Sequence, residues 1–297
     1  MARLIGLPRF LPLSLYYESQ IATPNSPVTP NLVLQPYSLQ QRFHGALRLS
    51  QLGPNAISRP IADPQPCLQW LQQPHRQAPP PLTGDANADT IALLPLWLFT
   101  HESWRQRLAW LQQIPTWQTT SLNNQASLWL YGEAIAQVIR PQARLDRLLT
   151  SLEDRWQRQT HQAAPQLSPI WTDLLPQLSQ WQQQHTPLNQ VVSALPDRPE
   201  TVIAASLFAL VTSGSDWAIA QTRAHKLCPS TTAPANLLGG LWGAAYGWTN
   251  LAIDQLAAIP PEPAWQTLSQ NLLQAWAGQL SPSTNADRPT PIVFAPR

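Results

Sequence analysis

Apolar residues recur at helical spacing along most of the chain. Between Ala143 and Thr160 they occur at positions i, i+3, i+4, i+7 and i+11, which places them on one face of a helix. They are Leu145, Leu148, Leu149, Leu152 and Trp156. The charged residues of this segment fall outside that face, so the segment is predicted to form an amphipathic helix.

Similar spacing, with capping residues at the start and Gly or Pro at the end, predicts further helices. Asp89 is expected to cap a helix from Thr90 to Phe99, in which Pro95 introduces a kink. The other predicted helices cover residues 38–52, 121–139, 168–184, 199–211, 216–226, 233–248 and 263–278. No run of alternating apolar and polar residues is long enough for a sheet, so the predicted fold class is all-α.

Proline divides the chain into three expected regions. Prolines recur every few residues between positions 24 and 36, so residues 1–36 are expected to form an extended N-terminal arm. Residues 37–280 are expected to form one helical domain. Residues 281–297 are expected to form a proline-rich C-terminal tail.

Composition narrows the classes of protein. Charged residues make up only 11% of the 297 residues, hydrophobic residues make up 43%, and the formal net charge is +2. These values exclude an intrinsically disordered chain, which needs low hydrophobicity and high net charge. They also exclude a nucleic-acid-binding stripe, which needs clustered Lys and Arg. Lys226 is the only lysine, and the absence of a Gly-Lys-Ser/Thr triplet excludes a P-loop.

One uncharged stretch has the length of a membrane span. Residues 233–253 contain Gly239, Gly243 and Gly247 at four-residue spacing, as in helix contacts mediated by glycine. Because Pro234 and several polar residues lower its hydrophobicity, we expect instead a buried central helix that a neighbouring helix approaches closely. We therefore expect no membrane segment. The small number of cysteines fits a reduced, cytoplasmic protein.

Several motifs in the C-terminal half follow one another in a particular order. Glu200-Thr201-Val202 opens an apolar helix, and a second helix, Trp217–Leu227, leads into residues 228–233. Residues 237–247 then read Leu-Leu-Gly-Gly-Leu-Trp-Gly-Ala-Ala-Tyr-Gly. In this order they resemble the C-terminal part of the ADP-ribosylglycohydrolase family. In that family a Gly-Gly-Asp-Thr-Asp-Thr loop precedes a helix rich in Gly and Ala.

The N-terminal side carries two further similarities to the same family. Arg42-Phe43-His44-Gly45-Ala46-Leu47 resembles the family's first helix, and Gly53-Pro54-Asn55-Ala56 stands where Gly-Asp-Ala-Leu-Gly follows it. Asn87-Ala88-Asp89-Thr90 resembles the Thr-Asp-Asp-Thr motif that opens another helix. The resemblance spans most of residues 40–260, with no motif in the middle third.

The resemblance implies an all-α fold that holds two Mg²⁺ ions and hydrolyses ADP-ribosyl glycosidic bonds. Mg²⁺ prefers carboxylate ligands in octahedral geometry. The family's ligand aspartates fall here on Pro54, Ala88, Ser230 and Thr232, and only Asp89 is kept. Neutral groups do not offset the charge of two dications. We therefore expect a non-catalytic pseudoenzyme without a metal or other cofactor, in which Asp89 is a metal ligand only if a site survives.

Three functions remain open. The expected one is a binding or scaffold module whose partner is a protein or a nucleotide-like ligand, with no nucleic acid and no membrane. The second is an active hydrolase of ADP-ribosyl glycosidic bonds with altered metal ligands, which would use Mg²⁺. The third is a structural subunit of a larger assembly that uses the proline-rich arms and the tryptophans as contacts.

A remnant pocket is implied by the geometry of the family. That geometry would bring the loop around Asp89 close to the loop that follows the helix ending near Lys226. Asp89 is expected there to be a structural, hydrogen-bonding residue, with its donor from Ser230, Thr232, His225 or the backbone at a helix start. The residues assigned to the pocket are Asp85, Asn87, Asp89, Thr90, His225, Ser230, Thr231 and Thr232.

Overall fold

The chain folds into helices. The structure, a computed structural model, describes residues 38–51, 62–74, 76–160, 168–196, 198–229, 231, 233–248, 251 and 263–278. Helices joined by turns make up these residues, and none of them lies in a β-strand, which confirms the predicted all-α class. The arms expected at residues 1–36 and 281–297 lie outside the described residues. Residues Tyr37–Leu273 form one compact unit.

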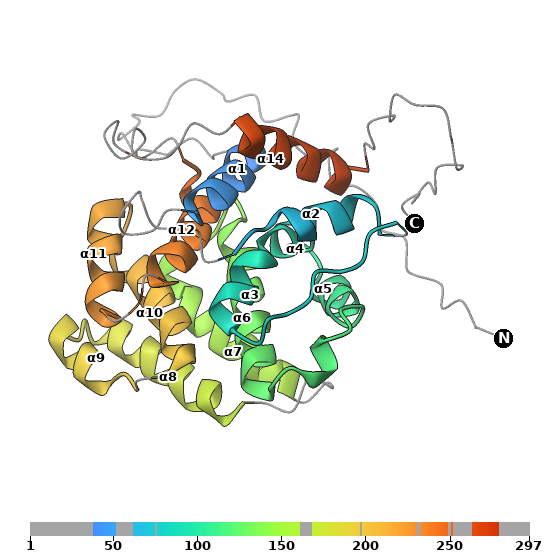
Figure 1. Cartoon of the computed structure of the whole chain (residues 1–297). Helices are drawn as coiled ribbons and strands as arrows, with labels where there is room; N and C mark the ends of the chain where they lie inside the picture. The colour runs from blue at the N-terminus through green and yellow to red at the C-terminus, as the bar shows by residue number, and fades with distance from the viewer. Residues whose placement is uncertain are drawn as a thin grey trace, which may run out of the picture. The chain divides into compact units, whose positions relative to one another are not determined.

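Figure 1 shows the order of the helices along the chain. The first half holds α1 (Leu39–Leu49), α2 (Gln65–Gln72), α3 (Ala86–Ala92), α4 (Leu94–Phe99), α5 (Trp104–Leu111), η2 (Trp117–Thr119) and α6 (Leu122–Val138). The second half holds η3 (Leu145–Arg147), α7 (Leu148–Thr160), α8 (Pro169–Gln183), α9 (Leu188–Ala194), α10 (Pro199–Thr212), α11 (Trp217–Leu227), α12 (Ala233–Tyr246) and α14 (Pro263–Trp276).

The predicted helix from Thr90 to Phe99 is wrong in its bounds. Two helices occupy this region, and they meet at Leu93. Pro95 lies in the first turn of α4, where its missing N–H costs no helical hydrogen bond. The first of the two helices begins earlier than predicted, because Asp85 caps it and Asp89 lies one turn inside it.

The closest helix contact joins α1 and α12, which run antiparallel (Figure 1). A Cβ atom on Gly243 would lie 2.1 Å from the carbonyl carbon of Gly45, and one on Gly239 would lie 2.0 Å from the carbonyl oxygen of Leu49. The two backbones therefore touch directly, and any side chain at either position would collide with main-chain atoms. This confirms the buried, glycine-lined central helix expected from the sequence.

Hydrogen bonds from two buried side chains hold α6 against the pair formed by α1 and α12. Arg42, on α1, is buried and donates from Nη1 to the carbonyl oxygens of Val138 at 3.0 Å and Ala244 at 3.4 Å. The hydroxyl of Tyr131, on α6, donates to the carbonyl oxygen of Leu237 at 2.8 Å. Arg42 thus joins α1 to the C-terminal ends of both α6 and α12, and Tyr131 joins α6 to α12 directly.

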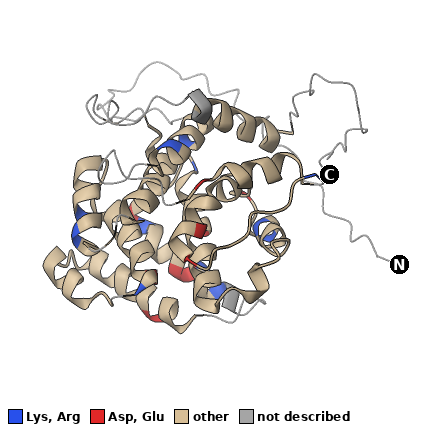
Figure 2. Ribbon diagram, in the orientation of Figure 1, with Lys and Arg blue, Asp and Glu red and all other residues tan. Residues whose placement is uncertain are grey.

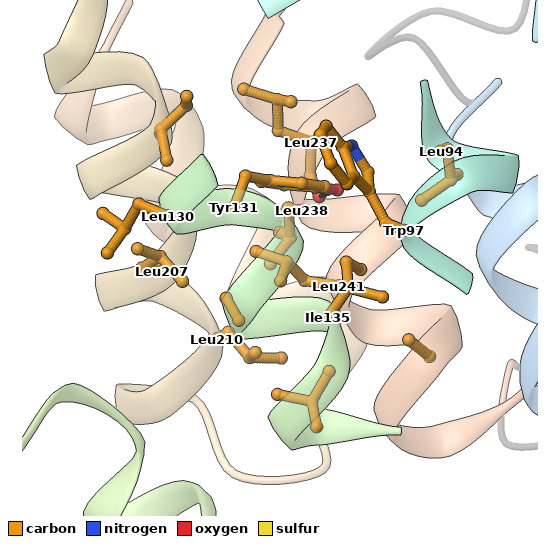
Figure 3. Close-up of a cluster of buried hydrophobic side chains, with 14 of the residues drawn as sticks. Leu94, Trp97, Leu130, Tyr131, Ile135, Leu207, Leu210, Leu237, Leu238 and Leu241 are labelled. Atoms are coloured by element: carbon orange, nitrogen blue, oxygen red, sulfur yellow. Dashed lines mark hydrogen bonds between the residues drawn. The ribbon is translucent and has the colours of Figure 1, made fainter. Parts of the chain in front are cut away.

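The centre of the core lies between α4, α6, α10 and α12 (Figure 3). Leucines from α10 and α12 meet Tyr131 and Ile135 of α6 there. Trp97 rests on Gly132, where a Cβ atom would lie 2.6 Å from its ring, and its indole N–H donates to the carbonyl oxygen of Thr90 at 3.1 Å. Trp97 is fully buried, so its one polar group is satisfied inside the core.

None of the helices within the described ranges has the length and apolar character that crossing a bilayer requires. The stretch that begins at Ala233 is one of these helices, and it is buried by protein neighbours instead.

Substitution of Gly243 tests the backbone contact. The Gly243→Ala variant should lose roughly 1–3 kcal/mol of unfolding free energy or more, because its methyl group meets main-chain atoms that cannot rotate away. Thermal and denaturant unfolding measure this loss. Ala235→Gly, on the same helix, is the control and should cost about 1 kcal/mol or less from helix propensity alone. An unchanged unfolding midpoint for Gly243→Ala would refute the contact.

Candidate functional site

Three helices begin at the end of the bundle where α1 stops. The side-chain amide of Asn236, in the first turn of α12, donates to the carbonyl oxygen of Ser50 at 2.7 Å. Ser206, in the middle of α10, donates to the carbonyl oxygen of Pro234 at 3.1 Å. The Sγ atom of Cys228 lies 3.8 Å from the carbonyl oxygen of Thr201, so the start of α10 lies close to the segment that leads into α12. The third helix, α3, contacts both of them. We call this region, marked by Asn87, Glu200 and Thr231, the α3–α10–α12 end.

Asp89 is buried behind the start of α3, and its carboxylate is fully engaged. Its Oδ1 accepts the backbone N–H of Thr83 at 2.7 Å and the hydroxyl of the same residue at 2.8 Å. Its Oδ2 accepts the backbone N–H of Gly84 at 3.1 Å. Gly84 has φ of +87°, a conformation that favours glycine. The side chain thus holds the turn before α3 against the helix.

These bonds identify the hydrogen-bond donors of the Asp89 carboxylate. The donors are the backbone N–H groups of the turn directly before α3 and the hydroxyl of Thr83, so they are backbone groups as expected but lie ahead of the helix start. His225 is exposed on α11, a helix that packs against α9, α10 and α12. Ser230 and Thr232 lie outside the described residues.

Two further pocket residues serve the helix itself. The carboxylate of Asp85 accepts the backbone N–H of Asn87 at 2.9 Å and so caps α3. The hydroxyl of Thr90 donates to the carbonyl oxygen of Ala86 at 2.5 Å. At the start of α12, Thr231 accepts the backbone N–H of Ala233 at 3.2 Å, which is also a capping bond. Asp85 and Thr231 therefore cap helix starts, whereas the hydroxyl of Thr90 bonds to a carbonyl group within α3.

Among the residues assigned to the pocket, Asn87 has a buried side-chain oxygen that accepts no hydrogen bond. It is 9% exposed, and its Oδ1 has no hydrogen-bond partner among the described residues. A buried, unpaired acceptor is unfavourable, so such an atom marks a place where an added donor is stabilising. Asn87 therefore differs from Asp89, both of whose oxygens accept hydrogen bonds, and from Asp85, which is exposed and caps α3 through Oδ1.

Glu200 is a second acceptor at this end, and sequence reasoning did not assign it to the pocket. It lies in the first turn of α10 and is 5% exposed. Among the described residues its carboxylate has no hydrogen-bond or ion-pair partner. A negative charge is favourable at a helix start. The signal in the sequence was an acid directly after Pro199 at the head of an otherwise apolar helix.

Together these groups offer two acceptors, and the amide of Asn87 also carries N–H donors. Asn87 contributes an amide oxygen and Glu200 a carboxylate, while no group of three or more His, Cys, Asp or Glu side chains in the described ranges is arranged to hold a metal ion. The region can thus accept hydrogen bonds from a ligand that carries hydroxyl or ammonium groups.

Sequence reasoning also missed a buried ion-pair network away from this end. Glu133, on α6, accepts a charge-assisted hydrogen bond from Arg107 of α5 at 2.9 Å and another from Arg155 of α7. Glu133 and Arg107 are each 1% exposed. Figure 2 shows that charged residues are otherwise scattered along the helices. The network joins three helices and is structural, because removing one partner leaves buried charges uncompensated.

His101 lies near this network and is buried against Phe43, with the two rings edge to face at 5.8 Å. Its Nδ1 lies 2.6 Å from the carbonyl oxygen of Leu98, so the neutral ring donates there. Burial is the main cause that lowers the pKa of His101 to about 4, and the positive charge of Arg107 adds to the effect.

Acid should destabilise the fold through His101. In the unfolded chain this residue protonates near its ordinary pKa of 6.5, whereas in the folded chain it stays neutral down to about pH 4. Its contribution to stability is therefore present above pH 6.5 and falls by up to about 1.4 kcal/mol per pH unit between these values. Denaturant unfolding from pH 7 to pH 4 measures this slope. His101→Asn keeps a donor for Leu98 and should flatten it.

The role of Asp89 is tested by Asp89→Asn. The amide nitrogen would face the N–H of Gly84 or the donors of Thr83, so one buried donor loses its acceptor, at a cost of about 1–3 kcal/mol. Asp85→Asn is the matched control and should be nearly neutral, because Asn is an equally good N-cap. Equal stability of the two variants in denaturant unfolding would contradict the buried turn-holding role.

Comparisons of the chain with protein-family models, with curated proteins and with solved structures found no match. The likeness to ADP-ribosylglycohydrolases accordingly rests on the sequence motifs and their order.

Proposed function

We propose that this chain is a non-catalytic, ADP-ribosylglycohydrolase-like module that binds a nucleotide-like ligand at the α3–α10–α12 end. One observation carries the proposal. Asp89 is the single acid of the family's ligand motifs that the chain keeps, and the turn of Thr83 and Gly84 already takes up both of its oxygens. An acid whose two oxygens are taken up in this way is not free to coordinate a metal ion.

The remaining groups do not fit a pair of Mg²⁺ ions. Two dications need several carboxylates that are free to coordinate them. The position before Asp89 is Ala88, which has no donor atom, and Asp85 caps α3. Among the described residues at this end, Glu200 is the one buried carboxylate without a hydrogen-bond partner, and two Mg²⁺ ions need more than that. We therefore propose that binding does not depend on Mg²⁺ and that no hydrolytic step takes place.

The ligand class follows from the acceptors. The amide oxygen of Asn87 and the carboxylate of Glu200 suit a partner that donates hydrogen bonds, such as the hydroxyl groups of a ribose. The positive end of the α12 dipole lies at the same end of the bundle and favours a phosphate group nearby, although Thr231 already accepts the first N–H of the helix and Pro234 has none. A ribose joined to a phosphate combines both properties, and the resemblance favours ADP-ribose as the first ligand to test.

Calorimetry and a turnover assay together test this function. We expect the full chain to bind ADP-ribose equally well with and without millimolar Mg²⁺, and to release no ADP-ribose from an ADP-ribosylated peptide. Asn87→Leu should weaken binding roughly tenfold, which corresponds to one lost hydrogen bond. His225→Ala, on the exposed face of α11, is the control and should bind normally. Melting curves confirm that both variants are folded.

Two results would overturn the proposal in different ways. Turnover that requires Mg²⁺ and is lost in a folded Asp89→Asn variant would identify an active hydrolase with altered ligands. Absence of ADP-ribose binding in both conditions would reject the nucleotide-like ligand and favour a structural subunit.

A further inference from the structure

A second feature lies where α2, α4 and α5 meet (Figure 1), and it shares no residue with the α3–α10–α12 end. Trp110 of α5 contacts two other aromatic rings edge to face. Its ring centre is 4.8 Å from that of Trp70 on α2 and 6.2 Å from that of Phe99 on α4. Trp70 is buried, whereas Trp110 and Phe99 are half-buried, so this aromatic cluster has an accessible side.

The indole N–H of Trp110 is a hydrogen-bond donor that the fold does not use. In the described part of the chain it has no hydrogen-bond partner, whereas the indole N–H groups of Trp97 and Trp171 each have an acceptor. Unlike the unpaired indole nitrogen of Trp242, that of Trp110 is not enclosed by the core. The cluster therefore suits a ligand that brings apolar groups to the rings and a carbonyl group to the N–H.

An extended proline-rich segment has both properties. A polyproline II helix makes no internal hydrogen bonds, so its carbonyl groups are free to accept, and such segments bind aromatic-lined surfaces. Because this helix has three residues per turn, prolines at i, i+3 and i+6 align along one edge. Residues 24–30, which lie outside the described residues, read Pro-Asn-Ser-Pro-Val-Thr-Pro and have this spacing.

Charge is compatible with the same ligand. Neither α2 nor α4 carries a charged side chain, and residues 19–41 of the chain carry none either. On α5, Arg107 is paired with Glu133, and Arg105 lies over the ring of Trp104. A neutral segment can therefore dock without burying an uncompensated charge, which an acidic or basic peptide could not do on α2 and α4.

We propose that the cluster of Trp70, Phe99 and Trp110 is a docking site for residues 24–30 of a second copy of this chain. The indole N–H of Trp110 donates to a carbonyl group of that segment, and the prolines of the segment pack on the rings of Trp110 and Phe99. Each copy carries both the segment and the cluster, so the contact joins copies into dimers or longer assemblies.

A labelled peptide of residues 22–32 tests the docking site on the full-length chain. We expect binding in fluorescence anisotropy, and roughly tenfold weaker binding or less when Pro24, Pro27 and Pro30 of the peptide are replaced by Ala. That change removes both the proline rings and the preformed extended backbone.

A pair of matched variants tests the donor. Trp110→Phe keeps a ring in the cluster but removes the N–H, so it should weaken peptide binding about fivefold, as for one lost hydrogen bond. Trp104→Phe removes an indole N–H from the same helix, about 120° away around its axis, and should bind normally. Melting curves check that both variants are folded.

Self-association supplies a second readout. In analytical ultracentrifugation the full-length chain should assemble as its concentration rises, and an excess of free peptide should reverse the assembly. Pro27→Ala in the full-length chain should weaken assembly severalfold. This variant leaves the aromatic cluster unchanged, so it tests the contact even if Trp110→Phe does not fold.

Three results would overturn the proposal. One is a peptide that does not bind, or that binds equally well with Ala in place of its prolines. Another is equal peptide affinity of the wild type and a folded Trp110→Phe variant. The third is a chain that stays monomeric at concentrations above the Kd of the peptide. None of these measurements involves ADP-ribose, so their outcome is separate from that of the ligand test.

Discussion

The direct contact between the backbones of α1 and α12 is the constraint on which the remaining structure depends. Gly239 and Gly243 permit it, because a Cβ atom at either position would overlap main-chain atoms of α1. Once the two helices touch, the buried Arg42 reaches carbonyl groups at the end of α6 as well as on α12. A pair of helices far apart in the sequence thereby becomes the frame on which α6 and α10 pack.

The antiparallel direction of this pair also decides where polar groups gather. Because α12 starts where α1 ends, the starts of α3 and α10 lie at the same end of the bundle. Helix starts need acceptors, and Asp85 and Thr231 meet that need within the protein. The amide oxygen of Asn87 and the carboxylate of Glu200 take no part in this capping. The proposed ligand site is based on these two unpaired acceptors.

The chain has few charged residues, and two buried or half-buried groups of them differ in how their charges are compensated. Glu133 lies between Arg107 and Arg155, so three helices share one compensated cluster. His44 lies against Trp248 and beside Arg48, and burial together with the charge of Arg48 lowers its pKa. In a chain with few charged residues, each buried or half-buried one has a large effect, because few others are near enough to screen it.

The sequence by itself determined the helical class, most of the long helices and the glycine-lined central helix, because these depend on spacing within one segment. It missed α5 and α9, which are only eight and seven residues long and too short for a clear periodicity. It chose Asp89 as the cap although Asp85 caps α3, since both residues precede a helical segment. Only the tertiary structure decided that choice, the partners of Glu133 and the position of Glu200. Those outcomes depend on which backbone groups and side chains distant segments bring together, and no local pattern encodes that.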